Sequence, residues 1–77
     1  MNLKLPLTKK IVNGVAQISG QVKNQDGTPI GGANIMVKAT TTGTVSNSDG
    51  TYKLDTRQNT GSLVFSFVGF KTIEVSF

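Results

Sequence analysis

The chain is 77 residues long, which allows one small domain, and its lack of Cys and His excludes disulfides, thiol nucleophiles and imidazole bases. Its formal net charge of +4 comes mainly from three lysines in the first ten residues, Lys4, Lys9 and Lys10, and the later basic residues are scattered. This distribution argues against nucleic-acid binding, and no apolar run approaches the roughly 20 residues of a membrane-spanning helix.

The first sixteen residues are interpreted as a leader or linker outside the fold. Residues 9–17 begin with two lysines and carry a small-x-small sequence at Gly14-Val15-Ala16, which resembles the two ends of a secretory signal. The apolar middle of this segment is only about two residues long, against the usual 7–15. The alternative left open is that residues 9–15 form a strand.

From residue 17 onward the apolar residues alternate with polar ones, which is typical of strands with one buried face. The first strand is predicted at 18–23 and the second at 33–38. Asp26-Gly27 and Pro29 separate them, because Gly permits positive φ and Pro cannot donate to a ladder. Both segments are therefore expected to form half-buried strands joined by a turn.

A Thr-rich loop at 40–44 leads into a short strand predicted at 44–46. The sequence Asn47-Ser48-Asp49-Gly50 is a hairpin turn signal, because Asp-Gly suits type I′ and bulged turns. The next strand is predicted at 52–55, and a polar connection follows at 57–61.

Residues 63–68 form the most apolar run and predict a central strand covered on both faces. Gly69 interrupts the run, and a final strand is predicted at 72–77. Six short strands with regular turn signals are typical of an antiparallel sandwich or barrel. The predicted core consists of Ile18, Val22, Ile35, Val37, Leu54, Leu63, Phe65, Phe67, Ile73 and Val75.

Five stretches in register resemble one known family. The most specific are residues 40–52, TTTGTVSNSDGTY, and residues 67–72, FVGFKT, accompanied by 18–22, 26–38 and 63–66. Together they resemble the carboxypeptidase-regulatory-like domain, in the version found at the N-terminus of SusC/RagA-type TonB-linked outer-membrane transporters. The resemblance covers residues 17–77. It implies an all-β fold, a small antiparallel transthyretin-like Greek-key β-sandwich of six to seven strands.

The resemblance also implies a function. It predicts a non-catalytic accessory domain on the periplasmic side of the bacterial outer membrane, in a TonB-dependent transporter of glycans or other nutrients. Its implied partners are the plug and barrel of that transporter or the energising machinery, with no membrane insertion by the domain itself and with edge-strand self-association as a further possibility. The alternative is a stand-alone or surface module that binds carbohydrate or assists folding of an attached peptidase.

No catalytic, cofactor or metal residues are predicted, and binding residues are left unassigned. Asn47, Asp49 and Gly50 resemble part of a calcium loop, but the EF-hand pattern requires acids where the chain has Val45 and Thr56. Side chains of this kind more often cap their own turns. The interpretation here is therefore a capped turn.

Three other sites are rejected on similar grounds. Gly31-Gly32 precedes no helix that would hold a phosphate, and a Ser or Thr nucleophile would lack a base. An adhesin-type Lys–Asn isopeptide bond would lack its last-strand Asn, since none follows Asn59. The residues considered for partner recognition are Met36, the loop at 40–44, and whichever of Tyr52 and Phe70 is exposed.

Overall fold

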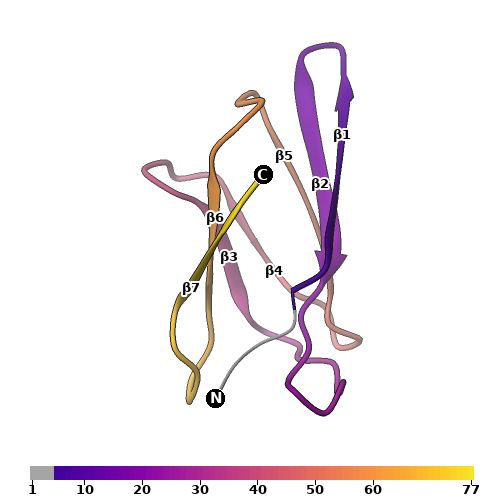
Figure 1. Ribbon diagram of the computed structural model, residues 1–77, viewed down its shortest axis with the longest axis vertical. Coiled ribbons are helices and arrows are strands. Elements are labelled where there is room, and N and C mark those ends of the chain that lie inside the picture. The colour runs from indigo at the N-terminus through magenta and orange to yellow at the C-terminus, as the bar shows by residue number, and fades with distance from the viewer. Residues whose placement is uncertain (1–4) are drawn as a thin grey trace.

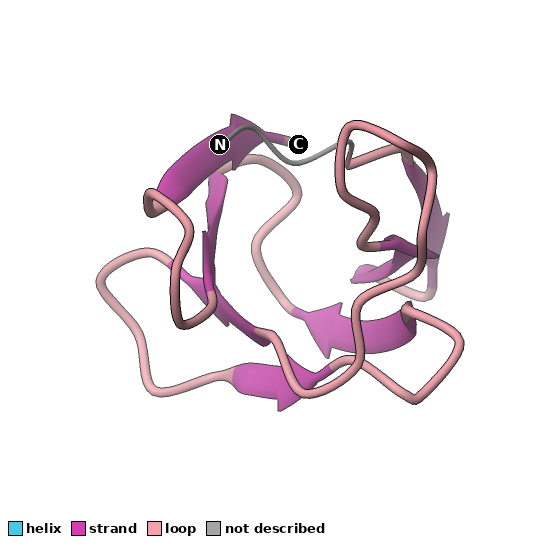
Figure 2. Cartoon of the chain, turned by 90° about the horizontal axis from the view of Figure 1, so that it is seen from below, coloured by secondary structure: helices cyan, strands magenta, loops and turns pink. Residues whose placement is uncertain are grey.

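The computed structural model describes residues 5–77, which form seven strands in two antiparallel sheets. One sheet has the order β1-β2-β5 and the other β4-β3-β6-β7. In Figure 1 the β1–β2 pair stands opposite β3, β6 and β7, and Figure 2 shows the strands surrounding the core. The strands are β1 (Leu7–Val12), β2 (Val15–Gln21), β3 (Asn34–Val37), β4 (Gly43–Val45), β5 (Thr51–Thr56), β6 (Ser62–Ser66) and β7 (Ile73–Ser76).

This architecture confirms the predicted all-β sandwich. The paired neighbours β2–β5 and β3–β6 are not consecutive in the chain, which crosses between the sheets three times, after β2, β4 and β5, as in Greek-key connections. Within residues 5–77 there is no helix long and apolar enough to cross a membrane.

The core lies between the two sheets and is formed by the inward positions of each strand. Phe65 is fully buried, and its ring meets the ring of Tyr52 edge-on, with centroids 5.5 Å apart. Such a pair is stabilised beyond its buried area by about 0.5–1.5 kcal/mol. Seven of the ten predicted core residues are buried, namely Ile18, Val22, Ile35, Val37, Leu54, Leu63 and Phe65.

The other three predicted core residues are half-buried. Phe67 and Val75 pack against the core from its margin, and Ile73 lies on the edge strand β7. An edge strand has no neighbour on one side to cover it, which explains the remaining exposure. Ala16, Ala33 and Tyr52 are buried although they were not among the predicted core residues.

The prediction that residues 63–68 are covered on both faces is wrong. Strand β6 is central within its sheet, between β3 and β7, but only its inner face meets the second sheet. Val64 is half-buried on the outer face, and Val68 lies in the following turn with 91% of its surface exposed. The apolar run therefore indicates that β6 lies in the middle of its sheet, and it does not indicate that both faces of the strand are buried.

The N-terminal segment also differs from the preferred interpretation. Leu7–Val12 is strand β1, which pairs antiparallel with β2 along its whole length. Asn13 and Gly14 join them with φ of 51° and 77°, the two positive values that a type I′ hairpin turn needs. The structure thus agrees with the alternative interpretation, in which part of the N-terminal segment forms a seventh strand. Residues 1–4, with Lys4, lie outside the described part, and the domain boundary at residue 17 stays a prediction.

The two long sides of the sandwich are unlike each other. On one, β4 contacts β5 and continues into it through the turn at 47–50. These two strands belong to different sheets, so the turn connects the sheets and does not close the hairpin that its sequence indicated. On the other, β1 and β7 each end a sheet. We call this second side, between β1 and β7, the open side.

Candidate functional site

Residues that carried the sequence resemblance gather at one end of the sandwich. Ser46 is buried, and its Oγ donates to the Ile30 carbonyl at 2.8 Å while accepting from the Ala33 N–H at 2.9 Å. The backbone of Ser46 bonds to Gly32 and Ala33 as well. We call this region, residues 22, 30–33 and 46–51, the turn junction. The Ser46 hydroxyl thus satisfies backbone groups of residues 30 and 33, where the chain turns into β3 and a neighbouring strand does not pair with them.

The Asp-Gly turn completes the turn junction. The Asp49 carboxylate accepts hydrogen bonds from the hydroxyl and the backbone N–H of Thr51, and these bonds lower the pKa of Asp49. Gly50 has φ of 81°, and its carbonyl accepts from the Val22 N–H at 2.8 Å. A Cβ at Gly50 would lie 2.5 Å from the Val22 carbonyl oxygen. The turn therefore needs Gly for both conformation and space.

Asp49 consequently acts as the cap of its own turn. The carboxylate is occupied by Thr51 rather than turned towards other acids. Residues 5–77 contain no group of three Asp, Glu, His or Cys side chains placed to hold a metal ion. The arrangement has the geometry of an Asx turn, as the sequence interpretation expected.

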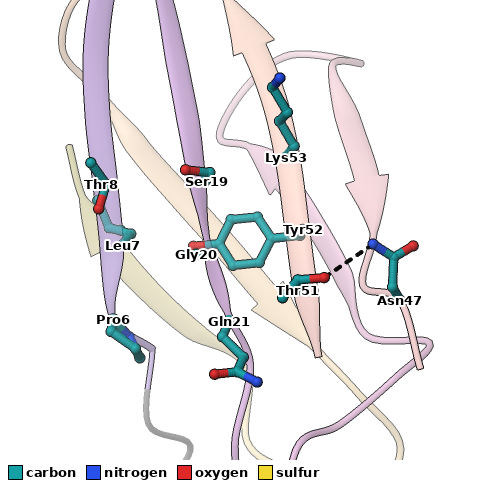
Figure 3. A pocket seen from close by; sticks show the side chains of 10 residues that line it. All are labelled: Pro6, Leu7, Thr8, Ser19, Gly20, Gln21, Asn47, Thr51, Tyr52 and Lys53. Carbon is teal, nitrogen blue, oxygen red and sulfur yellow. Dashed lines mark hydrogen bonds between the residues drawn. The ribbon is translucent and has the colours of Figure 1, made fainter. Parts of the chain in front are cut away.

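A shallow hollow of about 540 Å³ lies on the β1-β2-β5 sheet, and Figure 3 shows the side chains that line it. Tyr52 lies at its base, with its hydroxyl buried and unbonded within the described residues. Burial raises the pKa of Tyr52 to about 12. Polar side chains surround the hollow, namely Thr8, Ser19, Gln21, Asn47, Thr51 and Lys53.

The fit of Tyr52 depends on the residue opposite it. Gly20 pairs with Tyr52 across the strands, and a Cβ there would lie 2.7 Å from the tyrosine oxygen and 2.3 Å from the Pro6 carbonyl oxygen. The missing side chain of Gly20 thus makes room for the ring. Because the hydroxyl is itself buried, it cannot hydrogen-bond to a molecule resting in the hollow. The polar groups that the hollow offers therefore come from its walls and not from Tyr52.

The residues predicted for recognition are divided among different environments. Met36 is 43% exposed and lies beside the loop at 40–44, with Val45 also exposed nearby. Phe70 is half-buried against Phe67, with ring centroids 5.9 Å apart, and Tyr52 belongs to the core. The structure therefore brings Met36 and the loop together, whereas the aromatic candidates serve packing.

The residues of the open side were not among those predicted from the sequence. Lys9 projects from the edge strand β1, and its Nζ donates to the Asn59 carbonyl at 2.9 Å. The same Nζ lies 6.0 Å from the centre of the Phe77 ring. Asn13-Gly14 was the available signal, because this dipeptide is the strongest short indication of a hairpin.

A comparison with family models finds the CarboxypepD_reg-like domain over residues 18–77. The chain belongs to this family. The match confirms the resemblance seen in the sequence and begins one residue after its expected start. The matched range contains the whole turn junction.

Similar proteins are TonB-dependent receptors. The chain is 41% identical over 58 residues to the TonB-dependent receptor SusC of Bacteroides thetaiotaomicron, a match that covers 75% of this chain. It is 36% identical over 64 residues to a TonB-dependent receptor of Formosa agariphila, covering 83% of this chain. Each match spans only 6% of the relative's length. No solved structure matches the chain significantly.

Proposed function

We propose that this chain is a non-catalytic accessory domain of a TonB-dependent outer-membrane transporter, facing the periplasm and modulating nutrient uptake. The observation that carries the proposal is the family match over residues 18–77 combined with relatives that are TonB-dependent receptors. A domain that spans 6% of such receptors acts as one part of a larger chain. Glycans are the nutrient class that the resemblance implies.

The side-chain environments support a role without catalysis. The carboxylate of Asp49 caps a turn, and that of Glu74 forms an ion pair with Lys38 at 3.0 Å. General acid–base catalysis needs a titratable group positioned at a reacting atom, and the chain has no His. Its chemistry suits contact with protein, for which the plug, the barrel and the energising machinery are the candidates.

Deletion in the full-length receptor tests this proposal. Removing the segment that corresponds to residues 17–77 should leave the barrel folded in the outer membrane and reduce growth on the imported nutrient. Two controls accompany the deletion. One strain carries a flexible linker in place of the segment, and a second strain has the domain restored on the same chain. Unchanged uptake after deletion would contradict a role in transport.

A binding measurement separates the alternative function. Calorimetry with candidate glycans and the 77-residue chain should show no tight binding, because the aromatic residue that lines the hollow in Figure 3, Tyr52, is buried in the core and its hydroxyl is inaccessible. Binding at micromolar concentration or below would favour the carbohydrate-binding module instead.

A further inference from the structure

Strand β1 leaves one edge of its sheet unpaired along six residues. It ends the β1-β2-β5 sheet, so half of its backbone groups have no ladder partner. The Pro6 carbonyl accepts from Gln21, and the hairpin closes at the Val12–Val15 pair. Alternation in an antiparallel ladder then directs the backbone groups of Leu7, Lys9 and Ile11 outward. These are donors and acceptors suited to an added strand.

The side chains on this edge carry positive charge without a compensating carboxylate. Within residues 5–77, neither Lys9 nor Lys10 lies within ion-pair distance of an acid, whereas Lys38 is paired with Glu74. Lys9 uses one of its three N–H donors on the Asn59 carbonyl. Its ammonium group is held above the open side while retaining the capacity to bind a carboxylate.

Apolar surface accompanies this charge. Ile11 is 47% exposed on β1, next to Lys9 and Lys10. Across the open side, Val75 on β7 and Phe77 just after it are half-buried and pack at the margin of the core. An added strand with alternating side chains would cover this margin with one face.

The lysines also discriminate between possible occupants. A second copy pairing through the middle of β1 around a two-fold axis would place Lys9 or Lys10 opposite the same lysine of its partner, and like charges across strands are destabilising. Edge lysines are a recognised means of preventing such self-pairing. A strand with carboxylates at those positions would gain opposite-charge pairs instead.

We infer that the free edge of β1 binds an extended acidic segment of the same receptor chain by β-strand addition. The inference rests on the proposed function, since it takes the segment from the rest of a receptor. The matched relatives extend far beyond the domain, which covers 6% of their length. A tethered segment has an effective concentration that a separate short peptide lacks, so weak strand pairing suffices.

Peptide binding tests the chemistry of the edge. The probe is a synthetic peptide that alternates Val with Glu and Asp and is blocked at both ends, titrated into the 77-residue chain while backbone amides are followed by NMR. The amides of Leu7, Lys9 and Ile11 should shift most. The same peptide with Gln and Asn in place of the acids should bind about two- to tenfold more weakly, because two opposite-charge pairs are lost.

Two variants locate the interaction, and a third is the control. The double variant with Lys9→Gln and Lys10→Gln should bind the acidic peptide only as weakly as the parent binds the neutral peptide. Ile11→Pro should abolish binding with the lysines intact, because it removes an outward N–H and leaves the β1–β2 ladder in place. Lys53→Gln removes one charge from an exposed position on β5 and should leave binding unchanged. Equal binding of both peptides, or shifts confined to β7, would overturn the inference.

Cross-linking in the full-length receptor tests the source of the strand. A carbodiimide joins amines directly to carboxylates in contact, so mass spectrometry should find Lys9 or Lys10 linked to Asp or Glu of the same chain. Links only to another protein or to a second copy would overturn the inference, as would an absence of links at both lysines. The proposed function is tested separately, by uptake after deletion of the domain. The cross-linking result therefore decides only whether β1 binds the acidic segment.

Discussion

The turn junction and the open side use their residues in opposite ways. In the turn junction, Ser46, Asp49 and Gly50 each bond to backbone or touch it closely, so the recognisable motif is occupied by the fold. On the open side, Lys9 and Ile11 leave charge, apolar surface and backbone groups available. The comparison teaches that the residues by which this family is recognised fix the scaffold, whereas capacity for contact lies at less distinctive positions.

The largest expected effect comes from the core that both regions share. Phe65→Ala should destabilise the domain by about 3–5 kcal/mol, enough to unfold a protein of this size, since it removes a fully buried ring and its contact with Tyr52. Chemical denaturation followed by circular dichroism measures this change. The control is Val68→Ala, at a 91% exposed position, which should melt like the parent. Similar melting of both variants would contradict the core assignment.

Two glycines with nearly the same φ compare the regions directly. Gly50→Ala should cost about 3 kcal/mol, because positive-φ strain is added to a clash with the Val22 carbonyl. Gly14→Ala, in the β1–β2 turn, should cost about 1 kcal/mol, because no heavy atom lies within 4 Å of the new Cβ. Equal losses in denaturation would show that close packing at the turn junction contributes nothing.

Removing residues 1–14 measures how much β1 contributes. Loss of the strand exposes the β2 edge and removes the packing of Leu7 against the core, so the free energy of unfolding should fall by about 2 kcal/mol. The exposed edge should also promote dimers, detectable by sedimentation. A trimmed chain that melts like the parent and stays monomeric would restore the linker interpretation and the boundary at residue 17.

The smallest effect concerns the Tyr52 hydroxyl. Tyr52→Phe should leave stability at neutral pH unchanged or slightly higher, since the buried hydroxyl has no hydrogen-bond partner within the described residues. The pKa of Tyr52 is raised to about 12, above the usual value near 10, so the neutral phenol favours the folded state. The group therefore leaves stability unaffected below about pH 10, and stability falls as the pH rises towards 12 because the unfolded chain then releases the phenol proton more readily.

Alkaline unfolding measures this last effect. The parent should lose stability between about pH 10 and 12 in step with phenolate absorbance, whereas Tyr52→Phe should lose less over the same range. Identical pH profiles of the two proteins would contradict the burial of the hydroxyl.

Most of the fold was predictable because alternating side chains report which face of a strand is buried. Alternation, turn signals and the apolar run at 63–68 together located the six strands from β2 to β7 and placed Ile18, Ile35 and Phe65 in the core. The failures have physical reasons. Strand β1 lacks alternation because its inward positions include Lys9, and Tyr52 is buried only because Gly20 opposite it has no side chain. Such pairings depend on register between distant strands, which a linear pattern does not contain.

The candidate site was less predictable for a related reason. Exposure of Met36 and burial of Tyr52 depend on which strands become neighbours, and the free edge of β1 exists only once the sheets have formed. The sequence did predict that Asp49 caps a turn, because that bonding is local.

The crossed order of the strands has a consequence for how quickly the domain folds. Ala16 pairs with Thr56 and Asn34 pairs with Ser66, so both sheets are held by partners far apart in the chain. Loops between such partners must close before the contacts that stabilise them exist, which places folding in the slow, millisecond-to-second class. Only the β1–β2, β3–β4 and β6–β7 hairpins can form locally, within microseconds. Pairing of β2 with β5 and of β3 with β6 is therefore expected to limit the folding rate, and the hairpins stay unpaired and exposed until it occurs.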